Sequence, residues 1–245
     1  MPRRFSAFLC LAVLTATVAA CSNTAIAPGH NATTGVPADT ESLGIVSGEI
    51  VLTGHLFGPG NDTVVILSHM RPNDETAWFP YAQVLAGEGY AALTFNFRGY
   101  GDSGGSQDYG KLDDDLEAVV NYMRDRGKER IFLVGASMGA TTSLVVGERV
   151  GIDGIVAISP PAEFDSQDAL GAVPRVRAPK LFLASEDDAP ALDFENLFSA
   201  AADPKEEEIY PGIAHGTDLF DPNKNTEAAA VGERILSFLE EQGGP

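Results

Sequence analysis

The sequence offers little that would hold a cofactor. It contains no P-loop and no cluster of histidine, cysteine and carboxylate residues at the spacing of metal ligands. Nucleotide-dependent and metal-assisted chemistry rely on such groups, so the sequence implies no cofactor and no metal ion. Any reaction would have to be carried by ordinary side chains.

Basic residues are also scarce, with 16 Lys and Arg against 35 Asp and Glu and a net charge of −19. A chain this acidic repels polyanions, which argues against nucleic acid as a partner. It repels an anionic membrane surface for the same reason. Attachment to a membrane would therefore need a device other than a basic patch.

Long hydrophobic runs are confined to the N-terminus. Arg3 and Arg4 precede an apolar stretch from Phe5 to Val18, and no acidic residue occurs before Cys21. A basic start followed by an apolar run too short to span a bilayer stably is typical of an export signal. We predict that residues 1–20 form a signal peptide and that the mature protein is extracytoplasmic.

The end of this segment, Val18-Ala19-Ala20-Cys21, resembles the lipobox of bacterial lipoproteins, whose cysteine is acylated and becomes the new N-terminus. The resemblance implies that Cys21 carries a lipid such as palmitate and anchors the protein in the cell membrane. The alternative is an ordinary cleavage site with Cys21 as an unmodified thiol. Because Cys10 lies within the signal, the mature chain cannot form an internal disulfide, and its stability must come from a core.

Residues 21–43 are predicted to comprise the lipidated Cys21 and a flexible tether, because they are small, polar and interrupted by Pro and Gly. Residues 44–245 alternate short apolar runs with amphipathic segments, which predicts one α/β domain. Strands that are apolar throughout are typical of a mostly parallel sheet with helices on both faces. We expect strands at 45–57 (a hairpin), 63–68, 90–95, 131–134, 154–158, 180–184 and 208–210, and helices near 83–88, 112–123, 140–150, 191–200 and 231–239.

Three consecutive carboxylates, Asp113-Asp114-Asp115, open one of these helices. Such a cluster is compatible with a metal site, but the first turn of a helix also favours negative charge because the helix dipole is positive there. We interpret the three residues as a solvated helix start.

The stretch Gly135-Ala136-Ser137-Met138-Gly139 lies between the apolar run 131–134 and the helix predicted from Ala140. A serine in a tight strand-to-helix turn is lifted clear of the sheet, and flanking glycines let strand and helix approach without a Cβ clash. We therefore predict that Ser137 is a catalytic nucleophile. A serine hydroxyl needs a base, and the base needs an acid that orients it.

Candidates for both roles follow later strands. Asp187 and Asp188 come after residues 180–184, and His215 comes after residues 208–210. The carboxyl ends of parallel strands lie at one edge of a sheet, so these loops should meet Ser137 there. Of the four histidines, only His215 follows both the nucleophile and the acids in the chain. His215 is thus the predicted base, and either aspartate could be the acid.

Five segments resemble the α/β-hydrolase superfamily in order and spacing: Leu67-Ser68-His69, Phe97 to Gly104, Gly135 to Gly139, Ser185 to Asp188 and His215-Gly216. The resemblance covers about residue 45 to the C-terminus. It implies the α/β-hydrolase fold, with an eight-stranded, mostly parallel sheet and helices on both faces. Family members place the acid at the last position of a Gly-x-x-Asp segment, which favours Asp188 and leaves Asp187 in reserve.

The resemblance also implies an oxyanion hole formed by the backbone N–H groups of Met138 and Arg71. Met70 stands where the family usually has glycine, so Met70 is the alternative second donor. For the Arg71 side chain we expect a surface salt bridge with Asp74 or Glu75. The alternative is contact with an anionic substrate.

After the Ser137 turn, only residues 159–178 separate two of the predicted strands, which allows a minimal lid with one helical turn near 164–170. An open site of this kind favours small or accessible carboxylic esters. We expect a serine hydrolase that cleaves such esters through an acyl-enzyme. An S33-like peptidase or amidase and an inactive hydrolase-like envelope binding protein remain alternatives, and the sequence does not define the oligomeric state.

Overall fold

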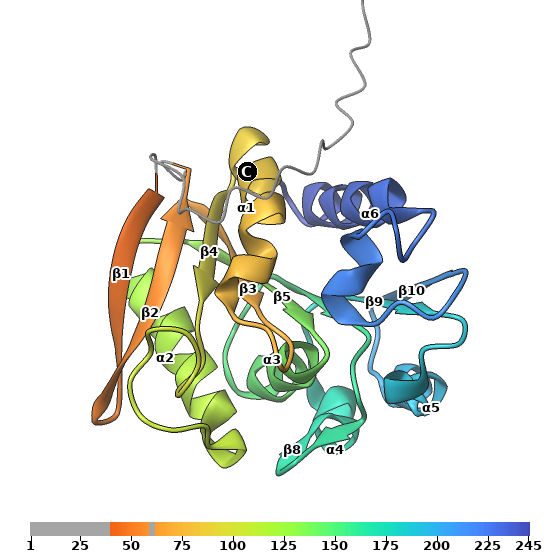
Figure 1. The fold of residues 1–245 in the computed structure, drawn as a ribbon, viewed down its shortest axis with the longest axis horizontal. Helices are drawn as coiled ribbons and strands as arrows, with labels where there is room; N and C mark the ends of the chain where they lie inside the picture. Colours follow the sequence, from red (N-terminus) through yellow and green to blue (C-terminus); the bar gives the residue numbers. More distant parts are fainter. Residues whose placement is uncertain (1–39, 59–61) are drawn as a thin grey trace, which may run out of the picture. The chain divides into compact units, whose positions relative to one another are not determined.

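The computed structural model describes residues 40–58 and 62–245. The predicted signal peptide, Cys21 and nearly all of the predicted tether lie outside the described residues. The described residues form one sheet of eight strands in the order β1-β2-β4-β3-β5-β6-β9-β10, together with a separate two-stranded hairpin, β7-β8 (Figure 1). In the part of the chain described, no helix is both long and apolar enough to cross a bilayer.

The sheet is mostly parallel. β1 and β2 form an antiparallel hairpin, β2 pairs antiparallel with β4, and every later pair in the order is parallel. The strands are β1 (Thr40–Ser47), β2 (Ile50–Phe57), β3 (Thr63–Ser68), β4 (Ala91–Phe95), β5 (Arg130–Ala136), β6 (Gly154–Ile158), β9 (Lys180–Ser185) and β10 (Lys205–Tyr210).

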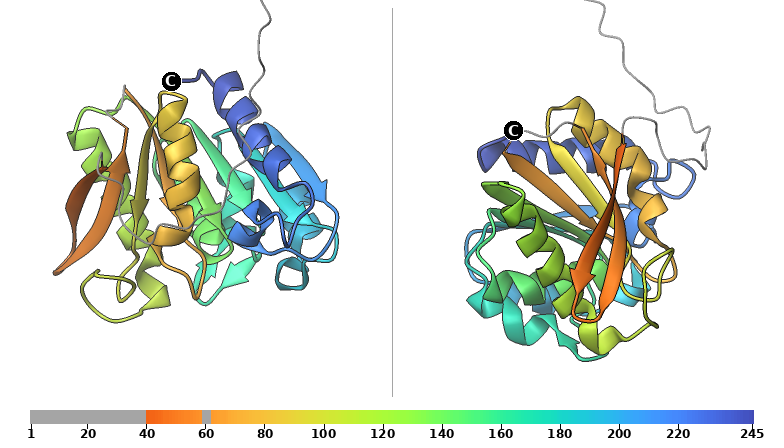
Figure 2. Two further views of the ribbon diagram at one scale, coloured as in Figure 1. Left: turned by 45° about the horizontal axis from the view of Figure 1, so that its top comes forward. Right: turned by 90° about the vertical axis from the view of Figure 1, so that its left-hand side faces the viewer.

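Helices cover both faces of the sheet (Figure 2). α1 and α6 pack on one face, and α2, α3, α4 and α5 pack on the other. The predicted α/β-hydrolase fold is therefore confirmed. The helices are α1 (Phe79–Gly87), α2 (Leu112–Asp125), α3 (Met138–Arg149), α4 (Ala169–Ala172), α5 (Phe194–Ala200) and α6 (Ala228–Glu241), and a 3₁₀ turn, η1 (Glu75–Trp78), precedes α1.

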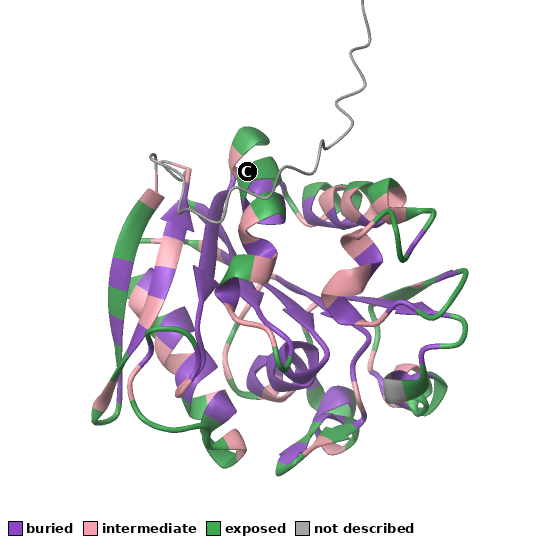
Figure 3. Cartoon of the chain, in the orientation of Figure 1, coloured by how far each residue is buried: buried purple, intermediate pink, exposed green. Residues whose placement is uncertain are grey.

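The central strands are buried on both sides, as Figure 3 shows. In β3, Val65 and Leu67 belong to the core under α1 and α6, whereas Val64 and Ile66 belong to the core under α2. Successive side chains of a strand point to opposite faces, so a strand between two helical layers must be apolar at every position. This is why the uninterrupted apolar runs predicted a parallel sheet.

The N-terminal boundary lies earlier than predicted. β1 begins at Thr40, which pairs with Phe57, so residues 40–43 belong to the sheet and not to the tether. Leu43 is buried, but its neighbours Glu41, Ser42 and Gly44 are exposed. An edge strand with a solvent-facing side alternates polar with apolar residues, and this short stretch gave too weak an alternation to be recognised.

The acidic start of α2 is only partly solvated. Asp114 is exposed and pairs with Lys111 at 2.9 Å, but Asp115 is fully buried. The two carboxylate oxygens of Asp115 accept hydrogen bonds from the Arg98 guanidinium at 2.6 and 2.9 Å, and the Ser47 hydroxyl donates to the same carboxylate at 2.7 Å. The interpretation as a solvated helix start is therefore wrong for Asp115, because the long-range partner Arg98 compensates its desolvation.

The segment between β6 and β9 forms a small cap. It contains the hairpin β7 (Glu163–Phe164) and β8 (Gln167–Asp168), followed by the single turn of α4 and a 3₁₀ turn, η3 (Val173–Arg175). The expected helical turn lies a few residues further on than predicted, because Asp165 adopts a left-handed conformation and turns the chain back into a hairpin.

Candidate active site

Ser137 occupies a strained turn between β5 and α3. Its φ of 49° and ψ of −115° lie in a region that residues other than glycine rarely adopt, at a cost of about 1–3 kcal/mol. A Cβ at Gly135 would collide with the Gly139 carbonyl, and a Cβ at Gly139 would collide with the Ser68 carbonyl. The two flanking glycines thus permit the close strand–helix approach that produces the turn.

The register of the sheet brings further loops to Ser137. Ser68 at the end of β3 pairs with Gly135 of β5, so the loop that starts at His69 emerges beside the turn. On the other side, the N–H of Ser137 donates to the carbonyl of Ile158, the last residue of β6, at 2.8 Å. Both neighbouring strands therefore end at the serine.

His215 and Asp188 form a close pair. The distance from His215 Nδ1 to Asp188 Oδ1 is 2.8 Å, and the Asp188 side chain is only 2% exposed. Asp188 Oδ2 has no hydrogen-bond partner among the described residues, so His215 is the group that stabilises this buried carboxylate. Asp187 is exposed instead. The structure thus brings Asp188, and not its neighbour, to the histidine.

Two serines hold the histidine loop from either side. Ser185, at the end of β9, donates to the Ala214 carbonyl at 2.8 Å, and the N–H of Gly216 donates to the Ser159 hydroxyl at 2.9 Å. Any Cβ at Gly216 would lie 3.5 Å from that of Ala136, so the loop packs against the residue before Ser137. The sequence did not indicate that Ser159 positions the His215 loop. The feature that could have indicated it is a serine directly after an apolar strand.

His69 is a structural histidine. It is fully buried; its Nε2 accepts from the N–H of Phe97 at 3.2 Å, so Nδ1 carries the proton and donates to the Met70 carbonyl at 3.0 Å. Burial lowers the pKa of His69 to about 4. The neutral ring stacks edge-on against Phe97 and Tyr100 and so ties the loop after β3 to the loop after β4.

Three backbone N–H groups near the Ser137 turn are candidates for binding an oxyanion. Met138 is the first residue of α3, where the helix dipole and free N–H groups favour negative charge. Met70 and Arg71 follow His69 beside it, and none of the three N–H groups donates to a backbone carbonyl in the described part of the chain. Met70 is buried, with its sulfur against Gly216, whereas Arg71 is exposed.

The salt bridge expected for Arg71 does not form. Asp74 caps η1 by accepting from the N–H of Thr76 at 2.9 Å. Glu75 is buried and accepts from Thr94 at 2.7 Å and from Asn96 at 2.8 Å. Both neighbouring carboxylates are therefore engaged elsewhere, which is the physical reason that the expectation is wrong.

The loop after β4 contains Gly99, Gly101 and Gly104, a spacing that matches a nucleotide-binding motif. In that motif, the loop leads directly into a helix whose N-terminus meets the phosphates. Here the loop closes on itself, because the N–H of Gly99 donates to the Gly104 carbonyl at 3.1 Å, and α2 begins only at Leu112. The loop is thus a compact turn and not a phosphate cradle.

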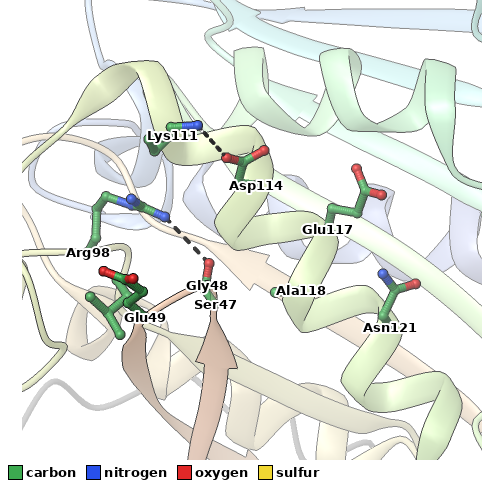
Figure 4. Close-up of a pocket in the computed structure, with 10 residues that line it drawn as sticks. Ser47, Gly48, Glu49, Arg98, Lys111, Asp114, Glu117, Ala118 and Asn121 are labelled. Carbon is green, nitrogen blue, oxygen red and sulfur yellow. Dashed lines mark hydrogen bonds and ion pairs between the residues drawn. The ribbon is translucent and has the colours of Figure 1, made fainter.

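A hollow of about 630 Å³, which Figure 4 shows in close-up, is lined by residues that do not include Ser137. It is formed by the turn between β1 and β2 together with α2, and its two cations, Arg98 and Lys111, are both paired with carboxylates. Neither Ser137 nor His215 nor Asp188 lines it, so the hollow is separate from the candidate active site at the Ser137 turn. The lining residues are Ser47, Gly48, Glu49, Ile50, Arg98, Lys111, Asp114, Glu117, Ala118 and Asn121.

A mostly parallel eight-stranded sheet with a strained serine turn after β5 is the architecture of the α/β hydrolases. The model of the alpha/beta hydrolase family matches residues 56–236. The chain therefore belongs to this family.

Two curated relatives align with most of the chain. The uncharacterized protein Rv2307c of Mycobacterium tuberculosis (strain H37Rv) is 27% identical over 209 residues, which cover 71% of this chain and 73% of the relative. The uncharacterized protein YfhR of Escherichia coli (strain K12) is 24% identical over 214 residues, with 76% and 75% covered.

Solved structures share the fold at low sequence identity. The Pyrococcus furiosus esterase Pf2001 superimposes with a TM-score of 0.72 at 20% identity and covers 82% of this chain and 91% of its own. A dienelactone hydrolase from Anabaena variabilis gives a TM-score of 0.68 at 19% identity, with 82% and 97% covered.

Proposed function

We propose that this protein is a serine hydrolase that cleaves small or accessible carboxylic esters through an acyl-enzyme. The observation that carries the proposal is the 2.8 Å contact between His215 Nδ1 and Asp188 Oδ1, together with the packing of the His215 loop against the residue before the strained Ser137. A nucleophile, a base and an acid on converging loops form the constellation of acyl transfer.

In the proposed mechanism, the Ser137 hydroxyl attacks the ester carbonyl while His215 accepts its proton. Asp188 orients the imidazole and stabilises its cation, and the N–H groups of Met138 and Arg71 bind the oxyanion. The alcohol then leaves with the proton from His215. Water, deprotonated by His215, releases the acid and restores the serine.

The short cap supports the preference for small or accessible esters. Residues 159–179 contain only the β7–β8 hairpin and two single helical turns, too little to enclose a long acyl chain. We expect faster hydrolysis of p-nitrophenyl acetate and butyrate than of emulsified long-chain glycerides. The same triad also serves amide cleavage, so matched anilides belong in the same panel.

Labelling by a fluorophosphonate probe tests the proposal. Wild-type protein should react covalently and Ser137→Ala should not, while Ser106→Ala, which removes an exposed loop serine, should label normally. A wild-type protein that is folded by circular dichroism but never labels would favour the inactive binding protein instead. Labelling that persists in Ser137→Ala would assign the nucleophile to another residue.

We further propose that a lipid on Cys21 holds the protein at the extracytoplasmic side of the cell membrane. The support is the signal-like segment that ends in Val18-Ala19-Ala20-Cys21. Incorporation of radioactive palmitate that is lost in Cys21→Ser is the expected result, and equal incorporation in both proteins would contradict it.

A further inference from the structure

Arg71 is an exposed cation beside the catalytic serine without a counter-charge. It lies on the loop after β3 and forms no ion pair within residues 40–58 and 62–245. Acidic residues outnumber basic ones by 35 to 16 in this chain. An arginine at the site therefore remains unpaired although carboxylates are abundant.

A phenol lies near Arg71 instead. The Tyr109 hydroxyl donates to Gln107 Oε1 at 3.2 Å, and the neighbouring Tyr100 hydroxyl and Arg71 guanidinium hold the pKa of Tyr109 below its ordinary value. A guanidinium carries five N–H donors in a planar fork, and a phenol oxygen can accept only a few hydrogen bonds. Arg71 thus keeps donors available for another acceptor, with Tyr109 close by.

Tyr100, which interacts with both Tyr109 and Arg71, also lies near the proposed catalytic groups. The Tyr100 ring lies 4.7 Å from the His69 ring, and its hydroxyl lies 4.0 Å from the sulfur of Met138, the residue after the nucleophile. Arg71 itself follows His69 by two residues. The Arg71 side chain therefore begins at one of the proposed oxyanion donors.

Tyr109 also contacts the cap. The Tyr109 ring packs edge-on against Phe164 of the β7–β8 hairpin with 5.2 Å between centroids, and Gln167 of the same hairpin donates to the Tyr109 carbonyl at 3.3 Å. The carboxylate of Asp165, at the tip of this hairpin, acts on Tyr109 electrostatically but forms no ion pair with Arg71. Tyr109 thus contacts the cap and lies near Arg71 of the loop after β3.

We propose that Arg71 and Tyr109 bind a compact anion of the substrate, a carboxylate or a phosphate, so that the enzyme prefers esters that carry such a group near the scissile bond. The inference rests on the proposed function and specifies its substrate class. An arginine fork matches the two oxygens of either group, and the Tyr109 hydroxyl can turn from Gln107 to donate a further hydrogen bond.

Two matched substrate pairs test the inference. p-Nitrophenyl hemisuccinate and p-nitrophenyl butyrate differ in a terminal carboxylate on the acyl side, and 1-butyrylglycerol 3-phosphate and monobutyrin differ in a phosphate on the alcohol side. The readout is the ratio of kcat/KM, anionic over neutral, because a change in the oxyanion hole affects both members of a pair and cancels. We expect Arg71→Gln to lower this ratio about 10-fold or more for one pair, mainly through KM.

Tyr109→Phe should lower the same ratio by a smaller factor, because it removes one donor and leaves the charge. Arg126→Gln is the control: Arg126 is an arginine paired with Glu41 at 2.7 Å on the far end of α2, and its removal should leave both ratios unchanged. The pair that responds identifies the anion and the side of the ester on which it sits. Ratios that do not change in Arg71→Gln for either pair, with or without a fall in Tm, would overturn the inference while the hydrolase function stands.

A protein that hydrolyses none of these esters would contradict the proposed function, and a binding assay then tests the inference separately. By calorimetry, Ser137→Ala should bind p-nitrophenyl hemisuccinate or 1-butyrylglycerol 3-phosphate more tightly than its neutral counterpart, and adding Arg71→Gln should abolish the difference. Equal binding of both members of each pair would overturn the inference here as well.

Discussion

Two histidines follow strands at the same edge of this sheet, and they differ in burial and in hydrogen-bond partners. His69 comes directly after β3 and is fully buried, with one ring nitrogen bound to the Phe97 N–H and the other to the Met70 carbonyl. His215 lies beyond β10 with its side chain 21% exposed, and its Nδ1 faces Asp188. One ring is bound at both nitrogens by backbone, and the other is bound at one nitrogen by a carboxylate.

The difference shows that burial and partners, not residue type, decide what an imidazole can do. Desolvation keeps His69 neutral near pH 7, with a pKa of about 4, so it exchanges no proton there and serves as a tie between two loops. Within the described residues, Nε2 of His215 has no hydrogen-bond partner. That nitrogen is thus available to take a proton from a nucleophile, which is the property a general base needs.

The largest effect should come from exchanging each histidine for glutamine. His215→Gln should reduce kcat about 10⁵-fold with a change in the free energy of unfolding of about 1 kcal/mol or less. His69→Gln should instead lower the free energy of unfolding by about 2–4 kcal/mol, because a fully buried ring and its hydrogen bonds are lost. Ester turnover and urea unfolding, measured on both variants, separate the two roles.

The comparison would fail if His69→Gln abolished turnover in a protein as stable as wild type. It would also fail if His215→Gln retained turnover, because another group would then be the base.

A smaller effect should distinguish the two adjacent aspartates. Asp188→Asn should reduce kcat about 10³- to 10⁴-fold, because an amide cannot stabilise the imidazolium and favours the wrong tautomer. Asp187→Asn is the matched control, with an exposed side chain, and should change kcat less than threefold. Equal losses in both variants would contradict the assignment of Asp188.

The smallest effect concerns the dependence of stability on pH. The pKa of His69 is about 4 in the folded protein against 6.5 ordinarily, so the unfolded chain binds more protons in this range and acid favours unfolding. Between pH 7 and pH 5, this group should lower the free energy of unfolding by about 2 kcal/mol. Urea unfolding at pH 7, 6 and 5 should show a steeper decline in wild type than in His69→Gln.

Glu75 acts in the opposite direction, since burial raises its pKa and protonation then favours the folded state. The slope of wild type alone therefore mixes both groups, and the difference from His69→Gln isolates the histidine. Identical slopes in the two proteins would show that His69 is not held neutral by burial.

Much of the fold was predictable because strands buried on both faces are apolar at every position. The runs at residues 63–68, 131–134 and 154–158 mark β3, β5 and β6, and glycines around Ser137 mark the strained turn. β1 was placed too late because an edge strand has a solvent-facing side. The choice of Asp188 as the acid rested on a resemblance, because residue type alone does not distinguish two adjacent aspartates. Asp187 and Asp188 differ in burial, which the structure shows.

By itself, the sequence determined the order of strands and helices, the glycine-flanked serine and the presence of a histidine and acids after later strands, because hydrophobic periodicity and backbone freedom are local properties. Only the tertiary structure decided which carboxylates were engaged. Asp115 pairs with Arg98, 17 residues away in the chain, and Glu75 belongs to a buried hydrogen-bond network. Arg71, on the loop after β3, therefore forms no ion pair with either of them. Such choices depend on which groups share a desolvated volume after folding.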